Sequence, residues 1–317
     1  MNNKMLNVPC CPLCGNKDAN LIERIDAKSL INIYKKKIEI DIKKYITSDI
    51  DYYHCNICSL GFFNPCPIGS AEFYEELQLN TWYYMDEKPE YDFALNFILN
   101  NVKGSVLEVG GGSGNFAKKI ISKKIKYVGL EFNELAVHKA NGVGIEMHRL
   151  DLSEYKDKFE EKHDCVVSFQ VLEHISRPYD FLRDSLRCLK SNGFLIIAVP
   201  NKRGVAGLLP NIFLDLPPHH ASHWTEDSLA YLKQLFNVEI VTINKERVAP
   251  QHIIAARKYL ILQALAPKAL AKNKLINNSL LFGLLNAISS ILARILSINT
   301  NTLYGHTIIA VFKKIAD

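Results

Sequence analysis

The chain has 317 residues, which is long enough for one large domain with a smaller one attached. Its 48% hydrophobic and 22% charged residues are ordinary for a globular protein with a sizeable core. The net charge of +5 is dilute over this length, which argues against a dedicated nucleic-acid-binding surface. Because Met1–Cys10 has no apolar run of the length of a secretory signal, we expect a cytoplasmic protein.

Cysteines are concentrated at the N-terminal end, where six of the eight lie in the first 66 residues. Four of them form two C-x-x-C pairs, Cys11 with Cys14 and Cys55 with Cys58. Four thiolates are the ligands of a closed tetrahedral zinc site, so residues 1–70 are predicted to form a small zinc-ribbon-like module with a structural ion. The 40 residues between the pairs predict a β-rich insertion. An iron–sulfur cluster or metal-free thiols are the alternatives.

Residues 71–250 alternate short apolar runs with helical patterns, as a doubly wound parallel sheet requires. The predicted strands are Ser105–Val109, Lys126–Leu130, Cys165–Phe169, Phe194–Val199 and Val238–Ile243. The predicted helices between them are Phe116–Ser122, Glu134–Ala140, Tyr179–Leu189 and Glu226–Leu235.

A glycine-rich segment follows the first predicted strand and opens a helix. Gly110, Gly112 and Gly114 allow a sharp turn and a close approach of the backbone to a ligand. The spacing Gly112-x-Gly114 also fits a relaxed dinucleotide-binding pattern. Glu108 favours a different ligand, because an acid two residues before Gly110 is unfavourable beside a pyrophosphate. A cofactor with an ammonium and a sulfonium group tolerates that acid.

These motifs resemble those of class I S-adenosylmethionine-dependent methyltransferases, whose glycine motif is E/D-x-G-x-G-x-G. The resemblance covers roughly residues 100–245 and the last strand. It implies that Glu131 accepts hydrogen bonds from both ribose hydroxyls and that Asp151 accepts from the adenine amino group. It also implies that Leu152 offers its backbone N–H and that Gln170 borders the methionine part. The cofactor-binding residues expected on this basis are Glu108, Gly110, Gly112, Gly114, Glu131, Phe132, Asp151, Leu152 and Gln170. Asp151 alternatively acts only as a helix cap.

Candidate general bases follow the predicted strand Phe194–Val199, which corresponds to the fifth strand of the family that the chain resembles. His219, His220 and His223 lie within five residues, after two prolines. Loops at this edge of an open α/β sheet bind ligands, and the pKa of histidine suits proton removal near neutral pH. We therefore expect one of these histidines to be catalytic, with packing or capping as the alternative. Trp82, Tyr83 and Tyr84 are candidates to line the acceptor entrance.

Residues 251–303 are aliphatic and poor in acids, and Leu275–Ala293 carries no charge. Leucine and isoleucine recur there at helical spacing. We expect a helical insertion packed on the sheet, or forming a lid or a dimer surface, with peripheral membrane contact as an alternative. Thr307–Phe312 within residues 304–317 is the predicted last strand, and its return to the sheet argues against a membrane span.

Together these features predict an α/β enzyme with a Rossmann-like seven-stranded methyltransferase sheet, an N-terminal zinc module and a C-terminal helical insertion. The predicted reaction is O- or C-methylation of a small molecule or saccharide by S-adenosylmethionine. The alternatives are an NAD(P)-dependent oxidoreductase and a nonenzymatic module that binds the same cofactor. No nucleic-acid partner is expected.

Overall fold

The computed structural model describes residues 8–78, 87–270 and 274–316. The chain forms two compact units, each assembled from three stretches of sequence. The cysteine unit contains Met1–Ile68, Asn201–Ser228 and Arg247–His306, and the Rossmann-like unit contains Gly69–Pro200, Leu229–Glu246 and Thr307–Asp317. Residues 201–228, which lie within the predicted range 71–250, group with the cysteine unit.

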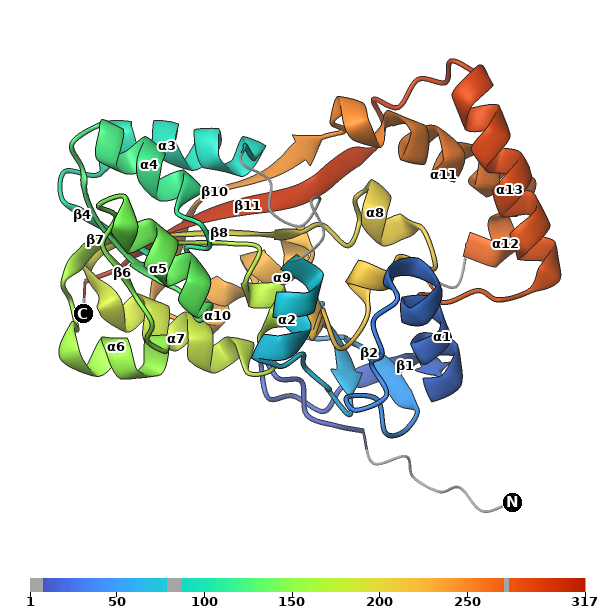
Figure 1. The fold of residues 1–317 in the computed structure, drawn as a ribbon, viewed down its shortest axis with the longest axis horizontal. Helices are drawn as coiled ribbons and strands as arrows, with labels where there is room; N and C mark the ends of the chain where they lie inside the picture. Colours follow the sequence, from blue (N-terminus) through green and yellow to red (C-terminus); the bar gives the residue numbers. More distant parts are fainter. Residues whose placement is uncertain (1–7, 79–86, 271–273, 317) are drawn as a thin grey trace. The chain divides into compact units, whose positions relative to one another are not determined.

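The Rossmann-like unit is built on a seven-stranded sheet in the order β10-β11-β8-β7-β4-β5-β6 (Figure 1). Its central strands β8, β7, β4, β5 and β6 are parallel, and β11 runs antiparallel to β8. The strands are β4 (Ser105–Val109), β5 (Lys126–Leu130), β6 (Met147–His148), β7 (His163–Phe169), β8 (Leu189–Pro200), β10 (Val238–Arg247) and β11 (Tyr304–Lys314). This sheet confirms the predicted α/β fold.

Both faces of the sheet are covered by helices (Figure 1). Helices α3 (Pro89–Asn101), α4 (Asn115–Ser122) and α5 (Glu134–Gly142) share one core with alternate strand residues such as Val167 and Ile196. The intervening residues, among them Val166 and Ile197, are also buried. Helix α7 (Pro178–Cys188) packs on β7 and β8, with α6 (Leu152–Lys158) beside it. Parallel strands buried on both faces explain the continuous apolar runs in the sequence.

The remaining helical segments of this unit are α2 (Ala71–Gln78), η1 (Leu172–His174) and α10 (Leu232–Leu235), and α9 (Glu226–Ala230) spans the boundary between the units.

The cysteine unit contains a four-stranded antiparallel sheet in the order β1-β2-β3-β9. Its strands are β1 (Ala19–Ile25), β2 (Ile50–Cys55), β3 (Gly61–Asn64) and β9 (Ser222–His223). The insertion between the cysteine pairs, predicted to be β-rich, contains β1 and most of β2 and also a twelve-residue helix, α1 (Ala27–Ile38), which follows β1. Asp26 starts that helix by accepting a hydrogen bond from the Ser29 N–H, and Leu30 and Tyr34 bury its inner face.

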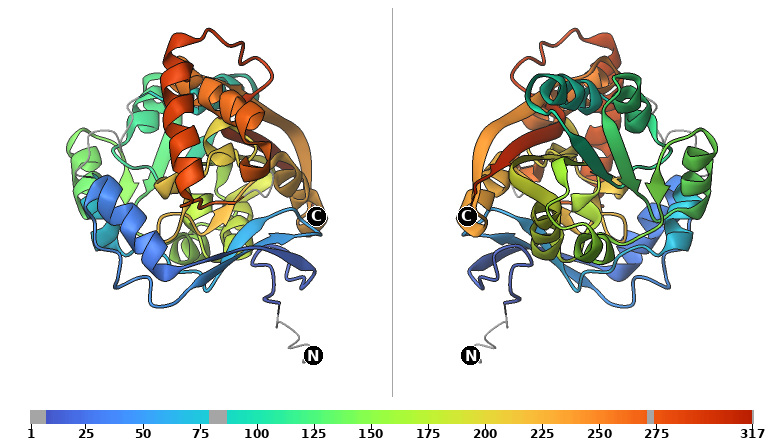
Figure 2. Two further views of the ribbon diagram at one scale, coloured as in Figure 1. Left: turned by 90° about the vertical axis from the view of Figure 1, so that its right-hand side faces the viewer. Right: turned by 90° about the vertical axis from the view of Figure 1, so that its left-hand side faces the viewer.

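The C-terminal part of the cysteine unit is helical. Figure 2 shows α11 (Ile253–Leu265) and α13 (Leu280–Ile295) lying side by side. Shorter segments are α8 (Val205–Leu208), η2 (Phe213–Asp215), η3 (Pro250–His252) and α12 (Pro267–Leu270). The apolar run predicted to begin at Leu275 becomes helical only at Leu280, where Ser279 caps the first turn. Within the described ranges, every helix is too short or too polar to cross a bilayer.

Candidate functional site

The glycine segment after β4 turns back sharply, because Gly110, Gly112 and Gly114 all have positive φ, at 82°, 51° and 78°. The N–H groups of Gly110 and Gly111 both donate to the carbonyl oxygen of Leu130, at 2.8 and 2.9 Å. A Cβ at Gly110 would lie 2.3 Å from a methyl carbon of Val171. Glycine is therefore required there for both conformation and space.

Glu131, at the end of β5, holds this loop through its carboxylate. One oxygen accepts from the Gly112 N–H at 2.8 Å, and the other accepts from the Asn133 N–H at 2.9 Å. Two backbone donors fix the orientation of the side chain, while each carboxylate oxygen retains a second lone pair for a ligand. Glu131 thus combines an anchored position with remaining capacity to accept.

A cavity of about 340 Å³ opens beside this loop. Its described lining residues are Val109, Gly110, Leu130, Glu131, Phe132, Leu150, Asp151, Leu152, Ser153, Val171, Ile175, Arg177, Asp180, Phe181 and Asp184. Within that lining the single basic side chain, Arg177, pairs with Asp180 at 2.6 Å. The mixture of apolar walls and four carboxylates suits a nucleoside without phosphate and is unfavourable for a pyrophosphate.

Asp151 and Leu152 begin helix α6 at the rim of the cavity. The Asp151 side chain accepts from the Ser153 N–H at 2.7 Å, so the alternative role as a helix cap is present in the structure. Both residues also line the cavity, together with Phe132, whose ring is 62% exposed. Capping uses one carboxylate oxygen and leaves the other able to accept from a ligand amino group.

Glu108 is only 1% exposed and is absent from the described cavity lining. One of its carboxylate oxygens accepts from the Tyr127 hydroxyl at 2.5 Å. Burial is the main reason that the pKa of Glu108 rises to about 8. The position of Glu108 is therefore that of a residue that supports the glycine loop.

Glu108→Gln should make the ligand-free protein more stable at alkaline pH. A carboxyl with a folded pKa near 8 and an ordinary unfolded pKa stabilises the fold fully at low pH, and this contribution is lost as pH rises through about 8. The full span is on the order of 4 kcal/mol. Thermal melts from pH 5 to 9 should show a decline in the wild type that Glu108→Gln reduces. Exposed Glu154→Gln is the control, and equal declines in all three proteins would contradict the prediction.

Gln170 directly follows β7 and has a positive φ of 57°. Its side-chain N–H donates to Glu90 at 3.2 Å and to the Thr307 hydroxyl at 3.4 Å, and it is absent from the described cavity lining. Burial raises the pKa of Glu90, which lies in the first turn of α3. Sequence patterns missed Glu90, since a Glu in the first turn of a helix is ordinarily read as a solvated charge.

The four predicted metal ligands meet in the cysteine unit. The sulfurs of Cys11 and Cys58 are 3.5 Å apart, those of Cys14 and Cys55 are 3.6 Å apart, and all four lie within 4.8 Å of one another. Zn–S bonds of about 2.3 Å in a tetrahedron require S···S separations of about 3.8 Å. The thiol set therefore fits zinc in number, chemistry and spacing.

Tight turns bring each cysteine pair together. Gly15 donates its N–H to the Cys11 carbonyl at 2.9 Å and has a φ of 72°. Ser59 donates to the Cys55 carbonyl at 3.0 Å with a φ of 59°. The left-handed residue that closes each C-x-x-C turn explains how two thiols two residues apart face one point.

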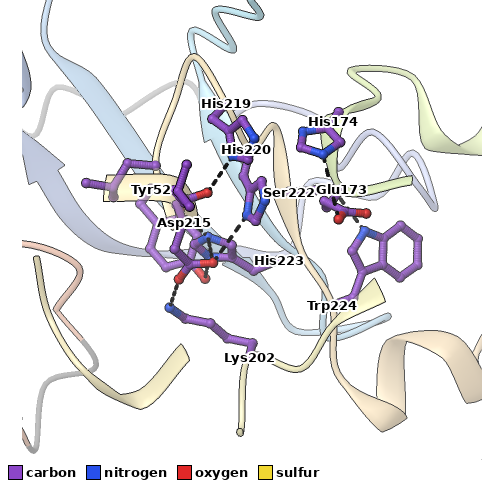
Figure 3. A network of polar contacts seen from close by, with 12 residues as sticks. Tyr52, Glu173, His174, Lys202, Asp215, His219, His220, Ser222, His223 and Trp224 are labelled. Atoms are coloured by element: carbon purple, nitrogen blue, oxygen red, sulfur yellow. Dashed lines mark hydrogen bonds and ion pairs between the residues drawn. The ribbon is translucent and has the colours of Figure 1, made fainter. Parts of the chain in front are cut away.

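Two of the predicted histidines, His220 and His223, lie against a largely buried carboxylate, Asp215, in the cysteine unit (Figure 3). His220 Nδ1 lies 3.4 Å from one Asp215 oxygen, and Lys202 Nζ lies 2.8 Å from the other. The ammonium group of Lys202 and hydrogen bonds from His220 and His223 hold the pKa of Asp215 well below its usual range despite burial. The network is thus built around an ionised acid.

His223 is committed to the interior of this network. Its Nε2–H donates to the Asp215 carbonyl oxygen at 2.7 Å, and its Nδ1 accepts from the Tyr52 hydroxyl at 2.9 Å. Burial lowers the pKa of His223, which favours the neutral ring. His219 Nδ1–H donates to the Leu214 carbonyl at 2.8 Å. Both nitrogens of His223 are engaged in contacts of the kind that the packing alternative describes, and its catalytic role stays a prediction.

Sequence reasoning missed the residues that organise this loop, namely Asp215, Lys202 and Tyr52. Asp215 lies five residues before His220 and eight before His223, without a recognisable spacing. Tyr52 comes from strand β2, and the sequence gives no indication of its pairing with a residue 171 positions later. The residues predicted to line the acceptor entrance, Trp82, Tyr83 and Tyr84, lie outside the described residues.

A comparison with protein families identifies the family of this chain. A model described as a methyltransferase domain matches residues 82–243. The chain belongs to this methyltransferase family. The prediction of a methyltransferase domain is confirmed, and the range covers the glycine loop, Glu131, Asp151 and the histidine loop.

Curated proteins that are similar to this chain are named as methyltransferases. It is 28% identical over 129 residues to the probable S-adenosylmethionine-dependent methyltransferase Rv3030 of Mycobacterium tuberculosis, covering 40% of this chain and 46% of that one. It is 25% identical over 149 residues to a ubiquinone biosynthesis O-methyltransferase of Sodalis glossinidius, covering 44% and 60%. The chain thus spans about half the length of these relatives.

Among solved structures, similarity extends to a SAM-dependent methyltransferase from Archaeoglobus fulgidus. The identity is 17% and the TM-score 0.46, with 71% of this chain and 94% of that one covered. A second is a putative sarcosine dimethylglycine methyltransferase from Galdieria sulphuraria, with 14% identity, a TM-score of 0.46, and 71% and 85% coverage.

Proposed function

We propose that this methyltransferase transfers the methyl group of S-adenosylmethionine to a hydroxyl group of a small molecule or saccharide. The observation that carries the proposal is the cavity beside the glycine loop, which is lined by four carboxylates and by one arginine already paired with Asp180. A cationic nucleoside is favoured there, whereas a nicotinamide dinucleotide would bring its pyrophosphate against those acids. The name of the ubiquinone biosynthesis O-methyltransferases supports a hydroxyl acceptor.

In this proposal, residues at the carboxyl edge of the sheet hold the nucleoside. Glu131 accepts from the ribose hydroxyls, while Asp151 and the Leu152 N–H bind the edge of the adenine. Phe132 covers the adenine face. Gly110, Gly112 and Gly114 let the backbone approach the methionine part, and Glu108 supports the loop from below. Gln170 acts from β7, beside Glu90.

The bound cofactor supplies a methyl group on a positively charged sulfur, which is a good leaving group. The protein then has to position the acceptor and remove its proton. His220 is the proposed general base, taking the hydroxyl proton on Nε2. Asp215 is a positioning residue, because its carboxylate faces Nδ1 of His220 and favours the tautomer with a proton on that nitrogen.

Replacing His220 with glutamine should lower kcat by about 10²- to 10⁴-fold, as expected for loss of a general base. Asp215→Asn should lower kcat less and shift the lower limb of the pH–rate profile, since it alters the charge and orientation of His220. The measurement is methyl transfer from labelled cofactor to panels of glycans and quinols, and His219→Gln is the neighbouring control.

The assay also distinguishes a base from a structural residue. An unchanged pH profile with a proportional loss of folded protein in both variants would mean that Asp215 and His220 only support the fold. Full activity of His220→Gln with a hydroxyl acceptor would remove the base assignment while leaving methyl transfer intact.

We further propose that zinc binds Cys11, Cys14, Cys55 and Cys58 as a structural ion. The four thiolates complete a tetrahedral shell, so the ion has no position open for an acceptor. This assignment is supported by the mutual separation of at most 4.8 Å between the four sulfurs.

A further inference from the structure

Helix α13 turns its most apolar face toward solvent. Leu281, Leu284, Ile288, Ile291 and Ile295 recur at intervals of three or four residues and form one stripe. Their exposed fractions lie between 47% and 72%. A stripe of five large aliphatic side chains on one helix is unusual on a water-exposed surface and marks an interaction site.

The opposite face of α13, which packs inward, is less apolar. Its buried residues are Phe282, Ser289 and Ala293. Helix α11 lies along α13 and exposes Ile254 and Leu265. Two of the three buried positions on α13 carry the small residues Ser289 and Ala293, although larger apolar side chains are present on the same helix. A lack of buried positions therefore does not explain the exposed stripe. It is the face that α13 presents to a partner.

The surroundings of the stripe are basic. From Arg247 to His306 the sequence has seven Lys or Arg residues and no Asp or Glu. Lys258 on α11 is half-buried, and this burial lowers its pKa, as do the neighbouring charges of Lys37 and Arg294. Within the described residues, the buried Nε of Arg257 has no hydrogen-bond partner. One acid, Glu23, reaches this segment, where it accepts from the Leu275 N–H and interacts with Lys274, whereas Lys37, Lys258 and Arg294 neighbour one another. These three neighbouring cations favour an anionic partner.

We propose that the α13 stripe docks this protein on an anionic lipid bilayer, with the helix parallel to the surface and its leucines and isoleucines inserted among the acyl chains. The apolar stripe supplies the hydrophobic contact, and Lys37, Lys258 and Arg294 supply the attraction to lipid phosphates. A second copy of the chain is a less favourable occupant, because two surfaces that each carry these unbalanced cations would repel one another.

Vesicle co-sedimentation of the full-length protein tests this directly. Wild-type protein should pellet with vesicles of phosphatidylcholine containing one-third phosphatidylglycerol, pellet far less with phosphatidylcholine alone, and lose binding as salt is raised. The triple variant Leu284→Gln, Ile288→Gln, Ile291→Gln should bind about tenfold or more weakly. The double variant Lys37→Glu, Arg294→Glu should lose a similar factor while retaining the stripe.

The controls change equally exposed residues in the Rossmann-like unit. Leu135→Gln with Val143→Gln matches the loss of apolar surface, and Lys123→Glu with Lys126→Glu matches the charge reversal. Cofactor binding should remain unchanged in every variant. Equal binding of the stripe variant, or equal pelleting with neutral vesicles, would overturn the proposal. A wild-type dimer in light scattering that becomes monomeric in the stripe variant would assign the stripe to a second copy.

Discussion

Purified Glu131→Ala protein should bind S-adenosylhomocysteine about 10- to 100-fold more weakly than the wild type. In the proposed complex the carboxylate accepts two ribose hydrogen bonds, and hydrogen bonds to a charged group contribute about 1.5–3 kcal/mol, where each 1.4 kcal/mol is tenfold in affinity. The substitution also removes the acceptors for the Gly112 and Asn133 N–H groups, which adds a loss from a looser loop. Isothermal titration measures the dissociation constant.

A second ligand separates the ribose contact from the support of the loop. The analogue lacking both ribose hydroxyls should bind the wild type weakly, and Glu131→Ala should weaken its binding further only by the smaller amount that comes from the looser loop. Glu134→Ala is the matched control, since that acid is exposed and pairs only with Arg149 at the surface among the described contacts. Unchanged affinity of Glu131→Ala would refute the ribose assignment. Wild-type protein that took up a nicotinamide dinucleotide and ignored S-adenosylhomocysteine would refute the proposed function itself.

Cys11→Ser should abolish stoichiometric zinc and destabilise the cysteine unit strongly. Structural zinc in small modules contributes about 10–16 kcal/mol of binding free energy, which is available only to the folded chain. Elemental analysis should find about one zinc per wild-type chain and little in the variant, and the melting temperature should fall markedly. Cys10→Ser is the matched control, because Cys10 is adjacent in sequence, is exposed and is not part of the four-sulfur cluster.

The result also decides between zinc and its alternatives. A wild-type protein that is folded and free of metal would remove the zinc assignment, whereas a brown protein containing iron and sulfide would replace it with a cluster. Chelation of zinc from the wild type should reproduce the loss of stability seen in Cys11→Ser. Cys10→Ser should respond to the chelator in the same way as the wild type.

The central strands could be predicted closely because their sequence signal is local. Strands β4 and β5 begin and end at the predicted residues, since each is a short apolar run, β4 between Gly104 and Gly110 and β5 from Lys126 up to Glu131. Helix Glu226–Leu235 was predicted as one element, but Tyr231 separates α9 from α10. Helix α1 was not named because the 40 residues between the cysteine pairs were predicted only as a β-rich insertion.

The candidate site was predictable only where spacing along the chain carries the chemistry. The glycine motif and the C-x-x-C pairs have fixed local spacing, and the structure brings each set together. Asp215 and Tyr52 could not be found in this way, because their roles depend on contacts between distant segments. Periodicity also located α13 without revealing that its apolar stripe faces outward, since a helical repeat gives the same pattern for either orientation.

Strand β9 limits how the cysteine unit can be exchanged between proteins. Ser222 and His223 pair with Phe62 and Gly61 of β3, and the hydroxyl of Tyr52 donates to His223. A chimera joined near residue 69 would pair one parent's β3 with the other parent's β9, and a truncated fragment ending there would leave an open strand edge prone to aggregation. Recombination between relatives should therefore transfer residues 1–68 and 201–228 as a matched set.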